Sequence, residues 1–461
     1  MLKALQSAGL ISLLLSRAGA LTMDSSSDAS IIAGAGECAY NMVKYYTGNN
    51  TGDTPGNLPD PYYWWEAGAM FGALIDYWAF TGDETYNAIT LQAMRHQVGD
   101  DADYMPANQT KSLGNDDQGF WLMASMTAAE MNFTNPDSDE PQWLALAQAG
   151  FNEYVDRWND ATATCGGGLR WQIYTFNNGY NYKNSISNGC FFNIASRLAR
   201  YTGNTTYGDW AEKIFAWEEN VNFISDDWQV LDGAGNADNA NCTEINGALF
   251  TYNAGIFVHG AAFMYNMTES DTWKERVTGL VTSISTTFFQ NGIMWEPPCE
   301  STSAGCNTDQ QAFKGHLARW LAYTAKLAPF TYDTIKPLLE SSATAAAEQC
   351  SGSPASSWKG HSGTACGFSW LANSTWDGHY GVGEQMNAMS VIMSNLFATS
   401  PSPYTSSTGG SSTGNADAGA SDSSKIATAA VITTGDKAGA GILTALVLAS
   451  LLSSVVLMIK E

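Results

Sequence analysis

Two neighbouring carboxylates, Asp116 and Asp117, stand just before an apolar run in the stretch GNDDQGFWLMASMTAAE, which covers residues 114–130. Aspartate suits the first turn of a helix, because its negative charge lies at the positive end of the helix dipole. One interpretation is therefore an ordinary solvated first turn that is capped by Asn115. The other interpretation is chemical, because two carboxyl groups held together can act as acid and nucleophile on one bond.

The spacing of the two carboxylates favours one kind of acid–base chemistry. Glycosidases that retain the anomeric configuration need two carboxyl groups only about 5–5.5 Å apart, whereas inverting glycosidases need about 6.5–9.5 Å to admit a water. The Cα atoms of neighbouring residues are about 3.8 Å apart, so their carboxyls can reach the shorter separation. Two carboxylates this close do not both ionise easily, and one pKa is expected to rise. The residues alone leave open which aspartate attacks and which donates a proton.

Polar and aromatic side chains elsewhere supply candidate contacts to a sugar. Glu66 follows two tryptophans inside an apolar segment, so it either pairs with a base or points at substrate hydroxyls. Trp64 and Trp171 either belong to the core or stack on the flat C–H faces of sugar rings. The stretch YNYKNSISNG is a Ser/Asn-rich turn on the simplest interpretation. It also concentrates groups that bind hydroxyls, namely Asn181, Lys183, Asn184 and Asn188.

Helices must position these side chains, because helical periodicity dominates the sequence. The stretch YYWWEAGAMFGALIDYWAF carries small residues at Ala69, Gly72 and Ala73, which allow a neighbouring helix to approach closely. This helix is expected to end at TGD, with Gly82 as a left-handed cap. The stretch FFNIASRLARYTGNTTYGDWAEKIFAWEE repeats the pattern of helix, Thr-Gly, tyrosine and helix. A degenerate third copy is AAFMYNMTESDTWKERVTGLVTSI.

The spacing of these copies predicts the architecture. Thr81 and Thr202 are 121 residues apart, and Tyr201 and Tyr265 are 64 residues apart. A unit of about 60 residues is two helices with their connections, and periods of this size indicate an array of helix hairpins. We expect an all-α fold, an (α/α)6 barrel whose loops form a bowl at one end, in preference to a solenoid of about 34-residue units.

The first twenty residues, MLKALQSAGLISLLLSRAGA, combine Lys3, a short apolar run and a small-x-small ending at Ala20. This pattern predicts a secretory signal peptide over 1–20. Seven Asn-x-Ser/Thr sequons agree with a secretory glycoprotein. They begin at Asn49, Asn108, Asn132, Asn204, Asn241, Asn266 and Asn373.

The other end carries an apolar run, Gly441 to Ile459, that is followed by only two residues. Small residues and a short polar spacer precede the run, and it lacks a basic cytoplasmic flank. The pattern predicts a glycosylphosphatidylinositol (GPI) attachment signal over 436–461 that is removed on maturation; a retained membrane helix is the alternative. The Ser/Thr/Gly-rich segment 401–435 is expected to form a flexible, O-glycosylated stalk. The folded domain is then 21–400.

The cysteine content and the net charge narrow the possible classes of protein further. Eight cysteines are an even number, which suggests disulfides in a secreted chain, and Cys299 with Cys306 is the expected local bridge. The sequence has no Cys-x-x-Cys pair and no histidines at helical metal-ligand spacing, so neither a metal nor another cofactor is expected. The stretch LDGAGNADNANC lacks the glycine of an EF-hand calcium loop. The net charge of −24 argues against nucleic acid as a partner.

Four stretches carry a resemblance to a known family. They are PYYWWEAGAMFGALIDYW, LGNDDQGFW, LRWQIYTFNNGYNYKNSISNGCFF and INGALFTYNAGIFVHGAAF. They resemble fungal members of glycoside hydrolase family 76, and among these the anchored mannan endo-1,6-α-mannosidases of the cell wall. The resemblance covers nearly all of 30–400 and implies an (α/α)6 barrel. It also implies that Asp116 is the nucleophile and Asp117 the acid/base. The same motifs suggest substrate contacts from Trp64, Glu66, Trp171, Gln172, Lys183, Asn184, Asn188, Tyr252 and Asn253.

The resemblance implies a retaining endo-α-1,6-mannosidase or transglycosylase of fungal cell-wall biogenesis. Its donor would be mannan or the glycan core of GPI-anchored proteins, and its acceptor a β-glucan. The enzyme would sit at the extracellular face of the plasma membrane through a GPI lipid, or in the cell wall. Two alternatives are a non-catalytic protein that binds mannan or mediates adhesion, and an enzyme that only hydrolyses the α-1,6-mannan backbone.

Overall fold

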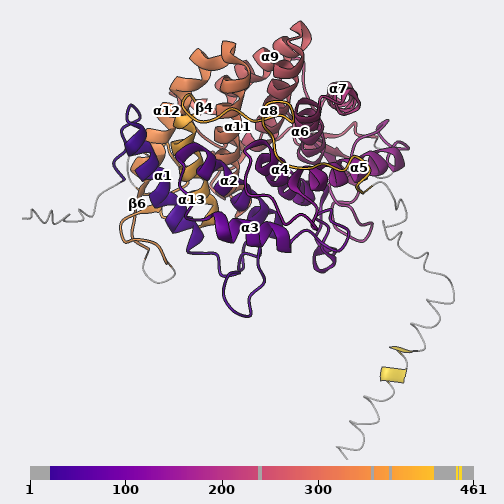
Figure 1. Ribbon diagram of the computed structural model, residues 1–461, viewed down its shortest axis with the longest axis horizontal. Helices are drawn as coiled ribbons and strands as arrows, with labels where there is room; N and C mark the ends of the chain where they lie inside the picture. Colours follow the sequence, from indigo (N-terminus) through magenta and orange to yellow (C-terminus); the bar gives the residue numbers. More distant parts are fainter. Residues whose placement is uncertain are drawn as a thin grey trace, which may run out of the picture.

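The computed structural model describes residues 21–236, 241–354, 358–372, 376–419, 443–444 and 446–448 (Figure 1). The expected signal peptide, the sequon at Asn373 and nearly all of 420–461 lie outside these residues. Within the described ranges, no helix has the length and apolar character that crossing a bilayer requires.

Six helices form a closed inner ring within the described residues. They are α2 (Trp64–Thr81), α4 (Asn115–Glu130), α6 (Ser185–Thr202), α8 (Thr251–Thr268), α11 (Phe313–Leu327) and α13 (Val382–Met393). Each packs against the next, and α13 returns to α2. Six helices cover this ring from outside, namely α1 (Asp28–Val43), α3 (Asn87–His96), α5 (Trp143–Asp160), α7 (Thr205–Asn220), α9 (Asp271–Thr287) and α12 (Tyr332–Gln349). The predicted (α/α)6 barrel is confirmed.

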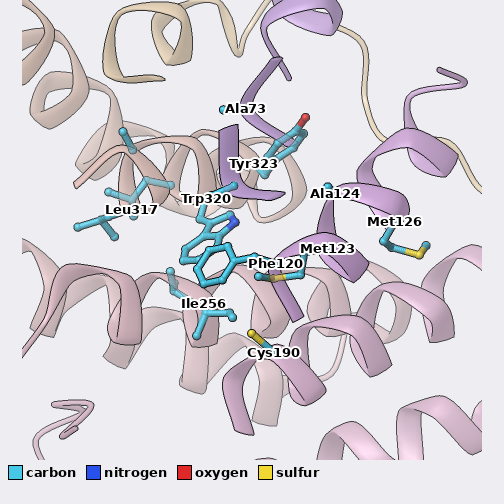
Figure 2. Packing of buried hydrophobic residues seen from close by; sticks show 14 of the residues in the cluster. Ala73, Phe120, Met123, Ala124, Met126, Cys190, Ile256, Leu317, Trp320 and Tyr323 are labelled. Atoms are coloured by element: carbon cyan, nitrogen blue, oxygen red, sulfur yellow. The ribbon is translucent and has the colours of Figure 1, made fainter. Parts of the chain in front are cut away.

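The inner helices are buried on nearly every side, as expected for helices without a polar face. Small residues let α2 and α4 approach closely: a Cβ on Gly68 would lie only 2.8 Å from the indole of Trp121. Figure 2 shows buried hydrophobic side chains from four inner helices lying close together. They include Phe120 and Met123 of α4, Cys190 of α6, Ile256 of α8, and Leu317 and Trp320 of α11. This packing fixes the helix ends that carry the site.

The repeated sequence pattern produces a helix end in the left-handed conformation at three positions. Helix α2 ends at Gly82 (φ 75°) and α6 ends at Gly203 (φ 73°), both in the left-handed conformation. Helix α8 ends in the same way at Glu269 (φ 52°), where a side chain takes the place of glycine. The degenerate third copy therefore keeps the turn at some cost in backbone strain.

Short strands and turns make up the loops between the helices. Strands β1 (Tyr182–Asn184), β2 (Gly233–Gly235) and β3 (Ile245–Asn246) form an antiparallel sheet before α6 and α8. Two further antiparallel pairs are β4 (Phe289–Gln290) with β5 (Ile293–Met294), and β6 (Cys350–Gly352) with β7 (Ala365–Cys366). Helix α10 (Pro297–Glu300) is a single turn, and four 3₁₀ turns cover Ala107–Gln109, Gln310–Ala312, Pro329–Thr331 and Ser394–Leu396.

Three disulfides join the described cysteines: Cys165–Cys242, Cys299–Cys306 and Cys350–Cys366. The predicted local bridge between Cys299 and Cys306 is confirmed. Cys38 and Cys190 are buried thiols, and the Cys38 sulfur lies 3.7 Å from that of Cys366.

Residues 401–419, which we call the strap, are not a flexible stalk. The backbone N–H of Tyr404 donates to the carbonyl of Glu130 at the end of α4, and Asn152 on α5 donates to the carbonyl of Ala418 at 2.7 Å. The hydroxyl of Ser412 accepts the N–H of Leu144 at 3.0 Å. Figure 1 shows the strap crossing the outside of the barrel toward α5. The expectation of flexibility is wrong for this segment, because backbone hydrogen bonds hold it although it has few large apolar side chains.

Candidate active site

A pocket of about 610 Å³ opens where five inner helices begin. The starts of α2, α4, α6, α8 and α11, with the loops before them, supply its walls. Helix N-termini carry partial positive charge, so this end of the barrel favours carboxylates and other electron-rich groups. Seven of the residues predicted from the sequence line the pocket, namely Trp64, Asp116, Asp117, Trp171, Gln172, Asn184 and Tyr252.

Asp116 and Asp117 form part of the first turn of α4 and also face the pocket. Oδ2 of Asp117 accepts the backbone N–H of Gly114 at 2.5 Å, so this carboxylate caps the helix. Oδ2 of Asp116 accepts the indole N–H of Trp171 at 3.1 Å, and its buried Oδ1 has no partner among the described residues. The expectation of a solvated first turn capped by Asn115 is wrong, because Gly114 is the N-cap and Asn115 is the buried first residue of the helix, and the same turn presents Asp116 and Asp117 to the pocket.

Gly114 shows how close the two carboxylates lie. A Cβ at this position would be 2.4 Å from Oδ1 of Asp116 and 2.8 Å from Oδ2 of Asp117. These two distances limit the separation of the two oxygens to about 5.2 Å, which is within the range of retaining glycosidases. Any side chain in place of Gly114 would enter this space.

Burial makes both carboxyls of the pair harder to ionise. It raises the pKa of Asp116 well above its usual range, and the charge of Asp117 adds to this effect. Burial raises the pKa of Asp117 to about 7; the Gly114 N–H opposes this shift, and the charge of Asp309 adds to it. Because both pKa values are raised, the coupled pair keeps a proton near neutral pH, and this proton belongs to the pair rather than to one carboxyl.

Trp171 is fixed on two sides, which leaves one face of its ring for the pocket. Its indole N–H binds Asp116, and a Cβ on Gly179 would lie 2.3 Å from the six-membered ring, so the backbone of Gly179 covers that face. The side chain is 39% exposed. This geometry suits a stacking surface beside the carboxylate pair.

Other predicted aromatic residues are shared between the pocket and the core. Trp64 stacks on Trp121 at 5.2 Å, and its N–H donates to Gln97 at 2.8 Å, yet its edge lines the pocket. Tyr252 stacks on Phe313 with a ring separation of 3.7 Å. These rings form a rigid wall, and their positions are set by packing as well as by the pocket.

Lys183 and Asn188 do not reach the pocket, and the expectation that they bind substrate needs correction. The fully buried ammonium of Lys183 donates to the carbonyls of three residues, Ala161, Thr164 and Gly167, at 2.5–3.0 Å. Asn188 exchanges hydrogen bonds with the backbone of Leu169 at 2.7 and 3.1 Å. Both side chains form hydrogen bonds with backbone groups of the loop between α5 and β1. The sequence pattern does not show that these buried backbone groups need side-chain partners.

Glu66 and Asn253 are also buried and do not line the pocket. Both carboxyl oxygens of Glu66 have no partner among the described residues. Burial raises the pKa of Glu66, with further contributions from the charges of Asp309 and Glu384. The amide of Asn253 faces Asp232 at 3.5 Å. Asn253 is thus placed to position a pocket residue, and Glu66 to lie behind the wall as a neutral acid.

Two pocket carboxylates were not predicted from the sequence. Asp232 accepts the hydroxyl of Tyr182 at 2.7 Å and the amide of Asn246 at 3.1 Å. Asp309 accepts the indole N–H of Trp65 at 2.8 Å. Both lie in loops far from the Asp-Asp motif, and no spacing in the sequence connects them to it. Burial raises the pKa of each.

The one cluster of metal-binding geometry among the described residues lies away from this pocket. It comprises Cys38, Cys350 and Cys366, and the last two are joined in a disulfide. The carboxylates of the pocket are instead held by N–H and O–H donors from the chain itself.

The chain is similar to known proteins over most of its length. The family model of Glycosyl hydrolase family 76 matches residues 30–407. Mannan endo-1,6-alpha-mannosidase DCW1 of Saccharomyces cerevisiae is 48% identical over 411 residues, which cover 89% of this chain and 88% of that protein. Mannan endo-1,6-alpha-mannosidase DFG5 of the same yeast is 43% identical over 445 residues, which cover 95% and 94%.

Two solved structures are also similar to this chain. The crystal structure of Dfg5 from Chaetomium thermophilum in complex with glucosamine has 46% identity and a TM-score of 0.81, and the match covers 87% of this chain and 97% of that one. The GH76A alpha-1,6-mannanase from Salegentibacter sp. HEL1_6 has 20% identity and a TM-score of 0.60, with 81% and 99% covered. At this lower identity the likeness shows the shared fold.

Proposed function

The chain belongs to glycosyl hydrolase family 76 and is a glycoside hydrolase, and from that premise we propose that Asp116 and Asp117 are its catalytic pair. The observation that carries the proposal is the placement of the two carboxyls around Gly114, within about 5.2 Å of each other at the pocket. A single proton shared by the pair gives the two protonation states that a retaining mechanism needs.

The proposed reaction proceeds in two steps. The carboxylate of Asp116 attacks the anomeric carbon, while the carboxyl of Asp117 gives its proton to the departing oxygen. A mannosyl ester on Asp116 results. The ionised Asp117 then takes a proton from a water or from a sugar hydroxyl, and that oxygen displaces the ester. The assignment of the two roles follows the family resemblance.

The proposed donor is an α-1,6-linked mannose glycan, as the names of the yeast relatives suggest. Among the described residues, the charged groups that line the pocket are four aspartates and one lysine, Lys111. This excess of negative charge suits a donor that carries a positively charged amine, such as an amino sugar. The glucosamine bound to the Chaetomium protein is such an amino sugar.

We further propose that a sugar, in particular a β-glucan, resolves the ester in place of water. Water is present at about 55 M, and an acceptor held in the pocket can compete because effective molarities reach about 10⁵ M or more. Such an enzyme would act at the extracellular face of the plasma membrane through a GPI lipid, or in the cell wall, after removal of the signals at 1–20 and 436–461.

The deciding experiment measures turnover and binding in the same variants. Asp116→Asn and Asp117→Asn should abolish release of products from α-1,6-mannooligosaccharides, while the thermal midpoint and the affinity for the oligosaccharide stay near those of the wild type. A non-catalytic mannan-binding or adhesion protein predicts no turnover in the wild type either. Near-normal turnover in a folded variant would remove that aspartate from the mechanism.

The choice between transfer and hydrolysis is tested separately in ¹⁸O-labelled water. Transfer leaves the new glycosidic products without label when a glucan acceptor is added. Label in every new reducing end, regardless of the acceptor, would leave a plain mannan hydrolase.

A further inference from the structure

The exposed aromatic side chains of the described residues gather at the pocket. Four aromatic residues have more than a third of their surface exposed: Tyr63 (59%), Trp171 (39%), Phe176 (59%) and Phe330 (40%). Tyr63 and Trp171 line the pocket, and Phe176 directly precedes two residues that line it. Only Phe330 lies elsewhere, in the turn between α11 and α12. Exposed apolar side chains that cluster in this way mark a binding surface.

Phe176 is held as a flat and rigid surface. Its ring stacks on Tyr174 with a separation of 5.3 Å and an angle of 18°, and Tyr174 is buried. One face of Phe176 is therefore covered, and the opposite face is open to solvent. The loop itself is fixed, because the amide of Asn177 donates to the carbonyl of Thr110 and its backbone N–H donates to the carbonyl of Tyr174.

Tyr63 lies on the other flank of the same site. It immediately precedes α2, while Phe176 lies in the loop that leads to α6. In the ring of inner helices, α4 stands between α2 and α6, and Asp116 and Asp117 belong to the first turn of α4. The carboxylate pair is thus flanked by one exposed aromatic side chain on each side.

We propose that Phe176 and Tyr63 are stacking platforms for an extended glycan that crosses the catalytic pair and continues beyond the pocket on the Phe176 side. The inference rests on the proposed function and adds the length of glycan that the site takes. Hexose rings present flat C–H faces that pack on aromatic rings. Asn178 lines the pocket beside Phe176, where its amide can bind the hydroxyl edges of the same sugars.

The test is calorimetric titration of the full chain carrying Asp117→Asn, so that no turnover occurs. The probes are α-1,6-mannobiose and α-1,6-mannotetraose. Adding Phe176→Ala should weaken binding of the tetraose by about 3- to 10-fold, from the aromatic contribution to stacking, and leave the biose unchanged. Phe176→Trp should restore the affinity. Phe330→Ala is the matched control, because it truncates an exposed aromatic far from the pocket, and it should change neither affinity.

If Phe176→Ala leaves the affinity for the tetraose and the thermal midpoint unchanged, Phe176 is not a stacking platform. The same result for Tyr63→Ala would overturn the second platform. A different result would contradict the proposed function itself: if the Asp117→Asn protein bound neither oligosaccharide, both the pocket assignment and this extension of it would be wrong.

Discussion

The indole N–H of Trp171 donates to Oδ2 of Asp116 at 3.1 Å, across 55 positions of sequence. A loop ahead of α6 thereby sets the orientation of a carboxylate on α4. Since Gly179 covers one face of the same indole, the ring cannot turn away without moving the loop. The carboxylate that is proposed to attack is held in place by a residue that also offers an aromatic face to the sugar.

Trp171→Phe separates these two contributions. Phenylalanine keeps an aromatic face and removes the hydrogen bond, so we expect kcat to fall by about 10- to 100-fold while KM changes little. Trp171→Ala should lower kcat and also raise KM. Steady-state kinetics with an α-1,6-mannooligosaccharide make the comparison, and an unchanged kcat in Trp171→Phe would mean that the hydrogen bond does not orient Asp116.

The pH dependence of kcat/KM should report the shared proton. Burial raises the pKa of both carboxyls, and the pair loses its last proton, the one that the acid donates, at the higher of its two apparent pKa values. Activity should therefore fall at low pH, when a second proton neutralises the attacking carboxylate, and at high pH, on an alkaline limb where the last proton is lost.

Two variants test which pocket carboxylate sets the position of the alkaline limb. Asp309 raises the pKa of Asp117 by its negative charge, so Asp309→Asn should move the alkaline limb to lower pH. Asp232→Asn is the matched control, because it removes another pocket carboxylate that does not contribute to this shift. An alkaline limb that stays in place in Asp309→Asn would argue that Asp117 is not the acid.

Lys183 should prove structural when it is replaced. Lys183→Met removes three hydrogen bonds to loop carbonyls, and we expect the free energy of unfolding to fall by about 3 kcal/mol. The KM of the folded fraction should be unchanged. Chemical denaturation and steady-state kinetics distinguish a structural role of Lys183 from substrate binding. An unchanged free energy of unfolding with a raised KM would mean that Lys183 binds the substrate.

The strap should add measurable stability to the domain. A chain that ends at residue 400 loses the hydrogen bonds to α4 and α5, and its Tm should lie several degrees below that of a chain ending at 419. A chain ending at 435 is the control and should match the chain ending at 419. Equal Tm values for the chains ending at 400 and 419 would show that the strap contributes nothing to folding.

Much of the fold was predictable because it depends on local rules. The pattern around Gly82 and Gly203 marks helix ends through a backbone conformation that glycine favours, and the structure has both turns where the sequence places them. The spacing of these turns then predicts helix pairs, and six pairs close a ring. The carboxylate pair was visible for the same reason, since two adjacent residues share their geometry in any fold.

The remaining features depend on contacts that the sequence does not encode locally. Lys183 and Asn188 look like hydroxyl-binding residues, yet backbone carbonyls accept the N–H groups of both side chains. Asp232 and Asp309 become pocket residues only when loops far apart in the chain meet. The prediction of flexibility failed for the strap because its composition says little about hydrogen bonds to the ends of distant helices.

The most direct test of the central claim is the configuration of the first product. The close separation of Asp116 and Asp117 predicts retention, because inverting glycosidases hold their carboxyls about 6.5–9.5 Å apart to admit a water. Proton NMR of the reaction with an α-1,6-mannooligosaccharide, recorded before mutarotation, should show the α anomer at the new reducing end. First appearance of the β anomer would mean inversion and would contradict the assignment of Asp116 and Asp117 as nucleophile and acid/base.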